Sequence, residues 1–241
     1  MGHQRSRDRY AALAPCPARV GRWTALLTAV LLLSPTGCSS AVELPVVLLA
    51  EDFDDDDNGW GTGEGLRLEA GAYIVAPPPG QRVARAADVL IAQESTIDRS
   101  RTTMDFTATN AAFVGVECAY EASGGTSRWY LLRVGVDGSR IERQPFGQGA
   151  DVTTLAEDRS VVLTDGPMSP QAPCLRSDED YRLALAVNGR TVLEATDPEP
   201  FGSGAPGLVV QAAPASERGD GAEVRIDRFV VTGPDGTADG R

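Results

Sequence analysis

Short apolar runs separated by turn signals are the feature that most constrains the fold of this chain. Almost no stretch after residue 50 sustains an apolar period of 3.6 residues, so long amphipathic helices are not expected. Asp137-Gly138 lies between two strand-like runs, and Asn188-Gly189 lies between two others. Such dipeptides are the strongest short-range signals of a β-hairpin. The pattern therefore predicts an antiparallel β-protein.

The strand-like runs are about 5 to 9 residues long and recur about every 10 to 15 residues, as in a two-sheet β-sandwich. A two-residue turn at Asn188-Gly189 would place Leu185 opposite Val192, with both side chains facing the core. Residues 84–93 fit either a strand or a short helix. The expected runs are residues 46–50, 66–76 (two short strands around Ala70-Gly71), 102–108, 112–120, 128–144, 180–196, 207–213 and 222–233.

The amino-terminal segment predicts export. Residues 1–22 are polar and rich in arginine, and residues 23–33 form a mostly apolar run. A membrane-spanning helix needs about 20 such residues, so this run fits the hydrophobic region of a secretory signal instead. Small and turn-forming residues then lead to Cys38, an order that resembles a bacterial lipoprotein signal. That resemblance implies a signal peptide over 1–37 and lipid on Cys38. The lipid would anchor the protein to the extracytoplasmic face of the cell membrane.

A linker over 38–45 and a sandwich over 46–233 would follow the leader, with a frayed tail over 234–241. The alternative for the leader is a plain signal peptide, which would give a secreted protein. Two cysteines then remain in the exported domain, Cys118 and Cys174. They form either a disulfide or two free buried thiols, and a disulfide is favoured in an oxidising compartment. Closing the loop of about 57 residues would stabilise the fold by ~4 kcal/mol.

The charge balance excludes one class of partner. The formal net charge is −12, and every basic residue is an arginine, which is typical of a GC-rich genome such as an actinobacterial one. Five arginines and one aspartate precede Cys38, so 17 arginines oppose 33 acidic residues from Cys38 onward, a net charge of −16. Such a surface repels nucleic acid, and we expect no nucleic-acid partner.

The acidic stretch 54–59 is a candidate calcium loop. Asp54, Asp56 and Asn58, followed by Gly59, match the first half of the pattern Asp-x-Asp-x-Asn-Gly. The glutamate that completes such a loop is expected at position 65, where this chain has glycine. The alternative is a solvated acidic turn ahead of a core tryptophan, and we expect no other cofactor.

Aromatic and arginine side chains are the candidate ligand contacts. Trp129 and Tyr130 either form an apolar platform under a sugar ring or belong to the core. Arg133 and Arg143, near the Asp137-Gly138 hairpin, either bind an acidic saccharide or balance the acidic surface. The only histidine is His3, which excludes a histidine-based triad in the exported domain.

Several segments together are similar to the concanavalin A-like lectin/glucanase domains of exported bacterial proteins, related to 3-keto-disaccharide hydrolase domains. The resemblance covers about residues 46–233. It implies an all-β fold, a jelly-roll sandwich of two antiparallel sheets, with sugar often bound on the concave face. It also supports the Cys118–Cys174 bridge. The similar segments are residues 51–60 (EDFDDDDNGW), 115–120 (GVECAY), 129–144, 181–197, 201–210 and 224–231.

The resemblance implies a fold more firmly than an activity. Glucanase members carry Glu-x-Asp-x-x-Glu, which supplies a nucleophile and an acid. This sequence has no such motif. We therefore expect a non-catalytic, extracytoplasmic lipoprotein that binds a glycan or an envelope component. The alternatives are a sugar-active hydrolase with an unrecognised carboxylate pair, and a structural or protein-interaction lipoprotein.

Overall fold

The computed structural model describes residues 46–92, 97–123, 126–146, 151–200, 202–214 and 221–233. The chain divides into two units, Met1–Ala41 and Val42–Arg241, and all described residues lie in the second. The predictions for the signal peptide, Cys38, the linker and the tail therefore fall outside the described residues. Within them the fold is almost entirely β, as predicted.

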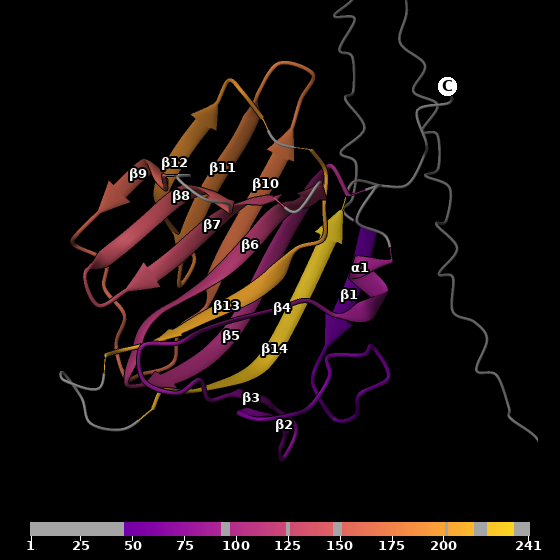
Figure 1. The fold of residues 1–241 in the computed structure, drawn as a ribbon, viewed down its shortest axis with the longest axis vertical. Coiled ribbons are helices and arrows are strands. Elements are labelled where there is room, and N and C mark those ends of the chain that lie inside the picture. Colours follow the sequence, from indigo (N-terminus) through magenta and orange to yellow (C-terminus); the bar gives the residue numbers. More distant parts are fainter. Residues whose placement is uncertain are drawn as a thin grey trace, which may run out of the picture. The chain divides into compact units, whose positions relative to one another are not determined.

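Two antiparallel sheets stack to form a sandwich, and they overlap in the view of Figure 1. Sheet A has the order β12-β11-β10-β5-β14-β3-β2, and β1 also pairs with β14. Its strands are β1 (Val46–Glu51), β2 (Leu66–Leu68), β3 (Tyr73–Val75), β5 (Arg99–Thr109), β10 (Pro170–Arg176), β11 (Tyr181–Val187), β12 (Arg190–Asp197) and β14 (Glu223–Gly233).

Sheet B has the order β4-β13-β6-β7-β8-β9, which places β6 and β7 at its centre. Residues 84–93, whose sequence fits either a strand or a short helix, supply both the end of an edge strand and the helix α1 (Asp88–Ile91). The strands of sheet B are β4 (Arg82–Arg85), β6 (Ala111–Ser123), β7 (Thr126–Gly135), β8 (Gly138–Phe146), β9 (Thr153–Asp158) and β13 (Gly207–Ala212).

Apolar side chains at alternate positions of both sheets meet in one core. The Cys118–Cys174 disulfide joins β6 of sheet B to β10 of sheet A across this core, with a Cα–Cα distance of 6.4 Å. The predicted pairing is therefore confirmed. The two cysteines are 56 positions apart in sequence. Their bond is a covalent link between two separate sheets, since the described strands of one sheet pair only with strands of the same sheet.

Both predicted hairpins form, but their details differ from the simple pattern. Asn188 and Gly189 both have positive φ, at 51° and 78°, as a type I′ turn requires. Beyond the turn the register shifts, so Leu185 lies opposite Leu193 and not opposite Val192 as predicted. A bulge takes up one residue, which keeps Leu193 directed into the core.

Strands β9 and β10 are not among the predicted runs. Strand β10 contains Pro170 and Pro173, and proline normally argues against an internal strand because it cannot donate to the ladder. It nevertheless pairs with β5 on one side and with β11 on the other. The disulfide at Cys174 holds this strand in the sheet.

Candidate functional site

The outer face of sheet B, which points away from the core, carries an unusual set of side chains. Alternation along β7 directs Tyr130 and Leu132 into the sandwich and Trp129, Leu131 and Arg133 to the outer face. Trp129, Leu131 and Val209 of β13 form a second apolar cluster, separate from the main core, with Phe113 and Tyr120 packed against it. We call this group the outer cluster.

Two carboxyl groups flank the outer cluster. Glu117 of β6 pairs with Leu131 of β7, and Leu131 pairs with Glu142 of β8. The three residues therefore form one row across the sheet, with the two glutamates two strands apart. Neighbouring strands are about 4.8 Å apart, which separates the two backbone positions by roughly 10 Å.

Hydrogen bonds hold the Glu142 carboxylate in place. The Arg133 Nε donates to its Oε1 at 3.1 Å, and the Gln144 Nε2 donates to its Oε2 at 2.7 Å. The Arg133 Nη1 also donates to Asp137 at 3.0 Å. Burial disfavours the charge on Arg133, but the hydrogen bonds and charges of these two carboxylates outweigh burial and raise the pKa of Arg133. Glu142 is thus part of a network of ion pairs and hydrogen bonds.

The side chain of Arg82 shows that the outer face is concave. Arg82 lies on the edge strand β4, and its Nη1 donates to the Gln144 Oε1 on β8 at 3.0 Å. In a flat sheet these strands would be about 19 Å apart, four steps of about 4.8 Å. The contact therefore requires the sheet to curl and Arg82 to extend over the face. Its guanidinium lies 5.8 Å from the centre of the Trp129 ring. We call this concave face the trough.

Glu117 differs from Glu142 in having no such partners. Its side chain is only 8% exposed, yet no hydrogen-bond donor among the described residues reaches its carboxyl. Desolvation raises its pKa to about 7, and the positive charge of Arg82 opposes that rise. The trough thus holds one carboxyl group that accepts hydrogen bonds from Arg133 and Gln144, and a second one, Glu117, whose pKa is raised by burial to about 7.

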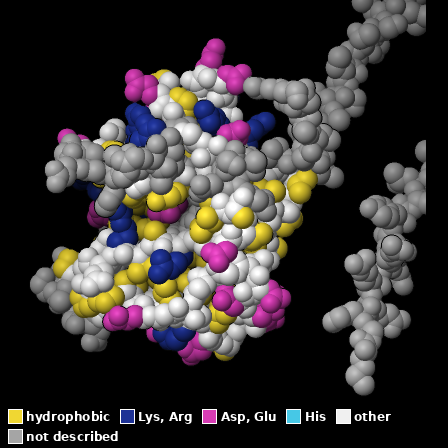
Figure 2. Space-filling view, turned by 45° about the vertical axis from the view of Figure 1, so that its right-hand side comes forward, with side chains coloured by type: hydrophobic (Ala, Val, Ile, Leu, Met, Phe, Trp, Pro, Cys, Tyr) yellow, Lys and Arg dark blue, Asp and Glu magenta, His cyan; other side chains and the backbone are white. Residues whose placement is uncertain are grey.

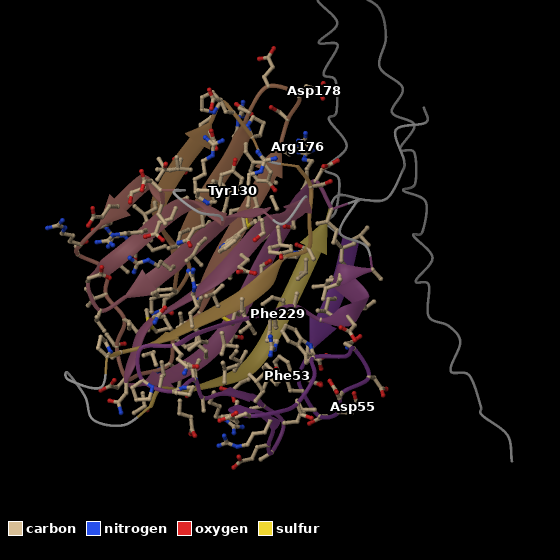
Figure 3. The ribbon with its side chains drawn as sticks, in the orientation of Figure 1. Phe53, Asp55, Tyr130, Arg176, Asp178 and Phe229 are labelled. Carbon is tan, nitrogen blue, oxygen red and sulfur yellow. A yellow bond between two sulfur atoms is a disulfide. The ribbon has the colours of Figure 1, made fainter. Side chains whose placement is uncertain are left out.

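The four predicted ligand contacts do not lie together. Trp129, 8% exposed, and Arg133 lie at the floor of the trough. Tyr130 is 0% exposed, faces the core, and donates its hydroxyl hydrogen to Asp197 at 2.7 Å, so its ring offers no surface for a sugar. Figure 3 shows Tyr130 among the strands of the sandwich. Arg143 lies on the same side as Tyr130, where its Nε is 3.4 Å from Asp197.

The acidic stretch forms a loop that is organised by Glu51 of β1. The buried Glu51 carboxylate accepts hydrogen bonds from the Phe53 backbone N–H, the Asn58 side-chain amide and the Trp60 indole N–H. Asp56 accepts from the Trp60 backbone N–H at 2.7 Å. Figure 3 shows Asp55 at the outer edge of the molecule, with Phe53 further inside.

The loop geometry bears on the calcium prediction for Asp54, Asp56 and Asn58. The Asn58 amide group and one Asp56 oxygen already serve the hydrogen bonds of the loop. In the described parts of the chain, no group of three or more His, Cys, Asp or Glu side chains could hold a metal ion. The observed contacts therefore match the alternative of an acidic turn ahead of the core residue Trp60, and calcium binding stays a prediction.

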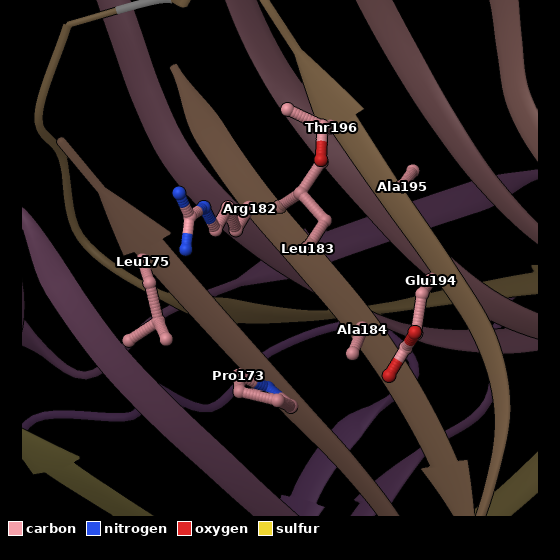
Figure 4. Close-up of a pocket in the computed structure, with 8 residues that line it drawn as sticks. All are labelled: Pro173, Leu175, Arg182, Leu183, Ala184, Glu194, Ala195 and Thr196. Carbon is pink, nitrogen blue, oxygen red and sulfur yellow. The ribbon is translucent and has the colours of Figure 1, made fainter. Parts of the chain in front are cut away.

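A depression of about 420 Å³ lies on the opposite side, on the outer face of sheet A (Figure 4). It is open and shallow, since small residues such as Ala184 leave space between larger ones on β10, β11 and β12. Arg182 at its rim already pairs with Asp180 at 3.4 Å. This depression lacks both buried unpaired carboxyls and aromatic rings. Its lining is Pro173, Leu175, Arg182, Leu183, Ala184, Glu194, Ala195 and Thr196.

On the face shown in Figure 2, arginine side chains are interspersed with acidic and apolar ones. None of the helices in the described part of the chain is long and apolar enough to cross a membrane.

Sequence reasoning did not single out Arg82, Glu117, Glu142 or Gln144. The available signal was the alternation in β7 and β8, which places Glu142 and Gln144 on the side of Trp129.

Comparisons with known proteins agree on the fold. No protein-family model matches the sequence, and no curated protein matches it. Among solved structures, the carbohydrate recognition domain of Emp47p is 13% identical, with a TM-score of 0.52 over 82% of this chain and all of that domain. A prokaryotic β-1,3-1,4-glucanase (lichenase) from a mouse hindgut metagenome is 14% identical, with a TM-score of 0.51 over 78% of this chain and 99% of the enzyme.

A pseudo β-1,3-glucanase of Mycobacterium tuberculosis, an immunostimulatory antigen, is 11% identical, with a TM-score of 0.50 over 78% of this chain and 99% of that protein. At such low sequence identities, the structural similarity establishes the fold and not the activity. The chain therefore has a concanavalin A-like jelly-roll sandwich, as predicted.

Proposed function

We propose that this domain binds a glycan in the trough of sheet B. The observation that carries the proposal is the lining of this concave face: the Trp129 indole, 8% exposed, packs with the buried Leu131 and Val209 and lies next to arginine, glutamate and glutamine side chains. Sugar rings present apolar faces and polar edges, so such a site can contact both. The similar structures include a carbohydrate recognition domain and a lichenase, which supports a carbohydrate ligand.

Arg82 lies over the Trp129 ring and would have to move when a sugar enters. It is an exposed side chain on an edge strand, held by one hydrogen bond to a neutral amide and by one cation–π contact. Contacts of this kind contribute about 1 kcal/mol each at exposed sites. A ligand that stacks on Trp129 and hydrogen-bonds to Arg82 replaces both contacts.

A glycan array tests this proposal. The protein should begin at residue 42, because the compact unit starts there and contains every residue of the core. We expect binding to at least one glycan class, and Trp129→Ala should weaken that binding by roughly tenfold or more. Leu175→Ala, on the outer face of sheet A, is the matched control and should bind like the wild type. Failure to bind any glycan, with or without calcium, would favour the structural or protein-interaction role.

Hydrolysis is the second candidate, because Glu117 and Glu142 occupy one row of the trough. Glycoside hydrolysis uses a pair of carboxyl groups that flank the scissile bond. The Glu142 carboxyl is already held by Arg133 and Gln144, which favours binding without catalysis. New reducing ends after incubation with glycans that bind on the array would establish hydrolysis, and Glu142→Gln should then abolish them.

We infer further that Cys38 carries lipid and anchors the domain to the outer face of the cell membrane. The support is the order of polar, apolar and small residues before Cys38. Expression of the full chain in a bacterium fed a labelled fatty acid should give a labelled protein in the membrane fraction. Cys38→Ala should lose the label, whereas Cys16→Ala should keep it. A secreted, unlabelled wild-type protein would contradict the anchor.

A further inference from the structure

Glu117 is a largely buried acidic residue of the trough whose carboxyl makes no hydrogen bond in the described part of the chain. It is 8% exposed. A polar group buried without a partner costs stability, and an apolar side chain would fit this position next to Leu131 at lower cost. Such groups in native proteins call for an explanation, and a ligand is one.

We propose that the Glu117 carboxyl contacts the ligand and forms a hydrogen bond with a sugar hydroxyl at the floor of the trough. This inference rests on the proposed function and assigns a specific polar contact to it. Glu117 lies in the same row as Leu131 and diagonally from Trp129, so a sugar ring placed on the Trp129 indole would bring its hydroxyls near this carboxyl. Ionised Glu117 can accept a hydrogen bond but cannot donate one, and it would be a buried charge beneath the ligand.

The charged groups around Glu117 do not cancel the effect of burial on its pKa. Strand β13 contributes Gly207 and Val209, which carry no charge. On β7 and β8, Arg133 and Arg140 both contact Glu142 and Asp137. Among the described residues, Arg82 of β4 is the charged group that acts on Glu117; its charge lowers the pKa, whereas burial raises it, to about 7. Binding should therefore be strong below pH 7 and weaken as the pH rises through 7.

The test measures glycan affinity between pH 5.5 and 8.5, with β-1,3-glucan and β-1,3-1,4-glucan oligosaccharides as probes. The wild type should lose about tenfold in affinity from pH 6 to pH 8, since the protonated fraction falls from about nine-tenths to about one-tenth. Glu117→Gln keeps a donor at every pH, so its affinity should not change over this range. Glu117→Ala should bind weakly throughout, and Arg82→Gln should move the midpoint to higher pH.

Glu194→Gln, on the outer face of sheet A, is the matched control and should keep the wild-type pH profile. A ligand-free NMR titration of the Glu117 side-chain carboxyl should give a midpoint near 7, and a midpoint near 4.5 would overturn the proposal. Binding with the same pH profile in wild type and Glu117→Gln would overturn this inference alone. No binding of either probe at any pH would overturn it together with the proposed trough site for these glucans, whatever the titration shows.

Discussion

The substitution Glu117→Gln should stabilise the fold at alkaline pH and not at acid pH. The Glu117 carboxyl has a model-compound pKa of 4.5, which applies to the unfolded chain, and a pKa of about 7 in the folded protein. Between these values the unfolded chain loses its proton first, so the free energy of unfolding falls as the pH rises. The contribution of Glu117 to the free energy of unfolding is therefore most favourable below pH 4.5 and is lost as the pH rises through about 7.

The magnitude follows from these two pKa values. Each pH unit between 4.5 and about 7 costs about 1.4 kcal/mol, so ionised Glu117 destabilises the protein by about 3 kcal/mol at pH 8. Glutamine has nearly the same shape and does not titrate in this range. Its buried amide has a cost of its own, but that cost is the same at every pH. The quantity to measure is therefore the difference between variant and wild type as a function of pH.

Urea unfolding at pH 4, 6 and 8 provides the assay. The difference in unfolding free energy, Glu117→Gln minus wild type, should rise by about 3 kcal/mol between pH 4 and pH 8. Glu194→Gln removes an exposed carboxylate and should show no comparable rise. A constant difference across this pH range would mean that Glu117 titrates like an exposed carboxyl, which would refute the argument from burial.

Three further predictions concern the scaffold. Replacing Cys118 and Cys174 with serine should lower the free energy of unfolding by about 4 kcal/mol, measured by chemical unfolding, and a reducing agent should affect only the wild type. Glu51→Ala leaves the Trp60 indole N–H without its acceptor, and we expect a loss of about 3 kcal/mol and altered tryptophan fluorescence. Tyr130→Phe removes one hydrogen bond to a buried carboxylate and should lower the thermal midpoint, at a cost of about 2 kcal/mol, without weakening glycan binding.

Local sequence patterns predicted most of the strands because their signals are short-range. The Asn188-Gly189 turn is one example, since both residues adopt the positive φ that only a few residue types tolerate. The bulge beside Val192 was not predictable in the same way. It depends on how Leu193 fits against the facing sheet, and that contact involves residues distant in sequence.

The candidate site shows the same division. Trp129 and Tyr130 were predicted to share one role, whereas in the structure alternation along β7 places Trp129 outside the main core and Tyr130 inside it; the stacking of the sheets decides which set faces the core. Arg82 comes from an edge strand, and sheet curvature brings it to Gln144. A sequence gives the period of a strand but not the curvature of its sheet.

The sequence by itself determined the all-β class, the hairpins, the acidic character and the even pair of cysteines, because each depends on composition or on residues close in the chain. Only the tertiary structure decided that Glu117 is largely buried and makes no hydrogen bond among the described residues, while Glu142 is held by Arg133. The two glutamates are chemically identical. What distinguishes them is the desolvation and the donors around each carboxyl, and both arise from strands that meet only after the sheet has formed.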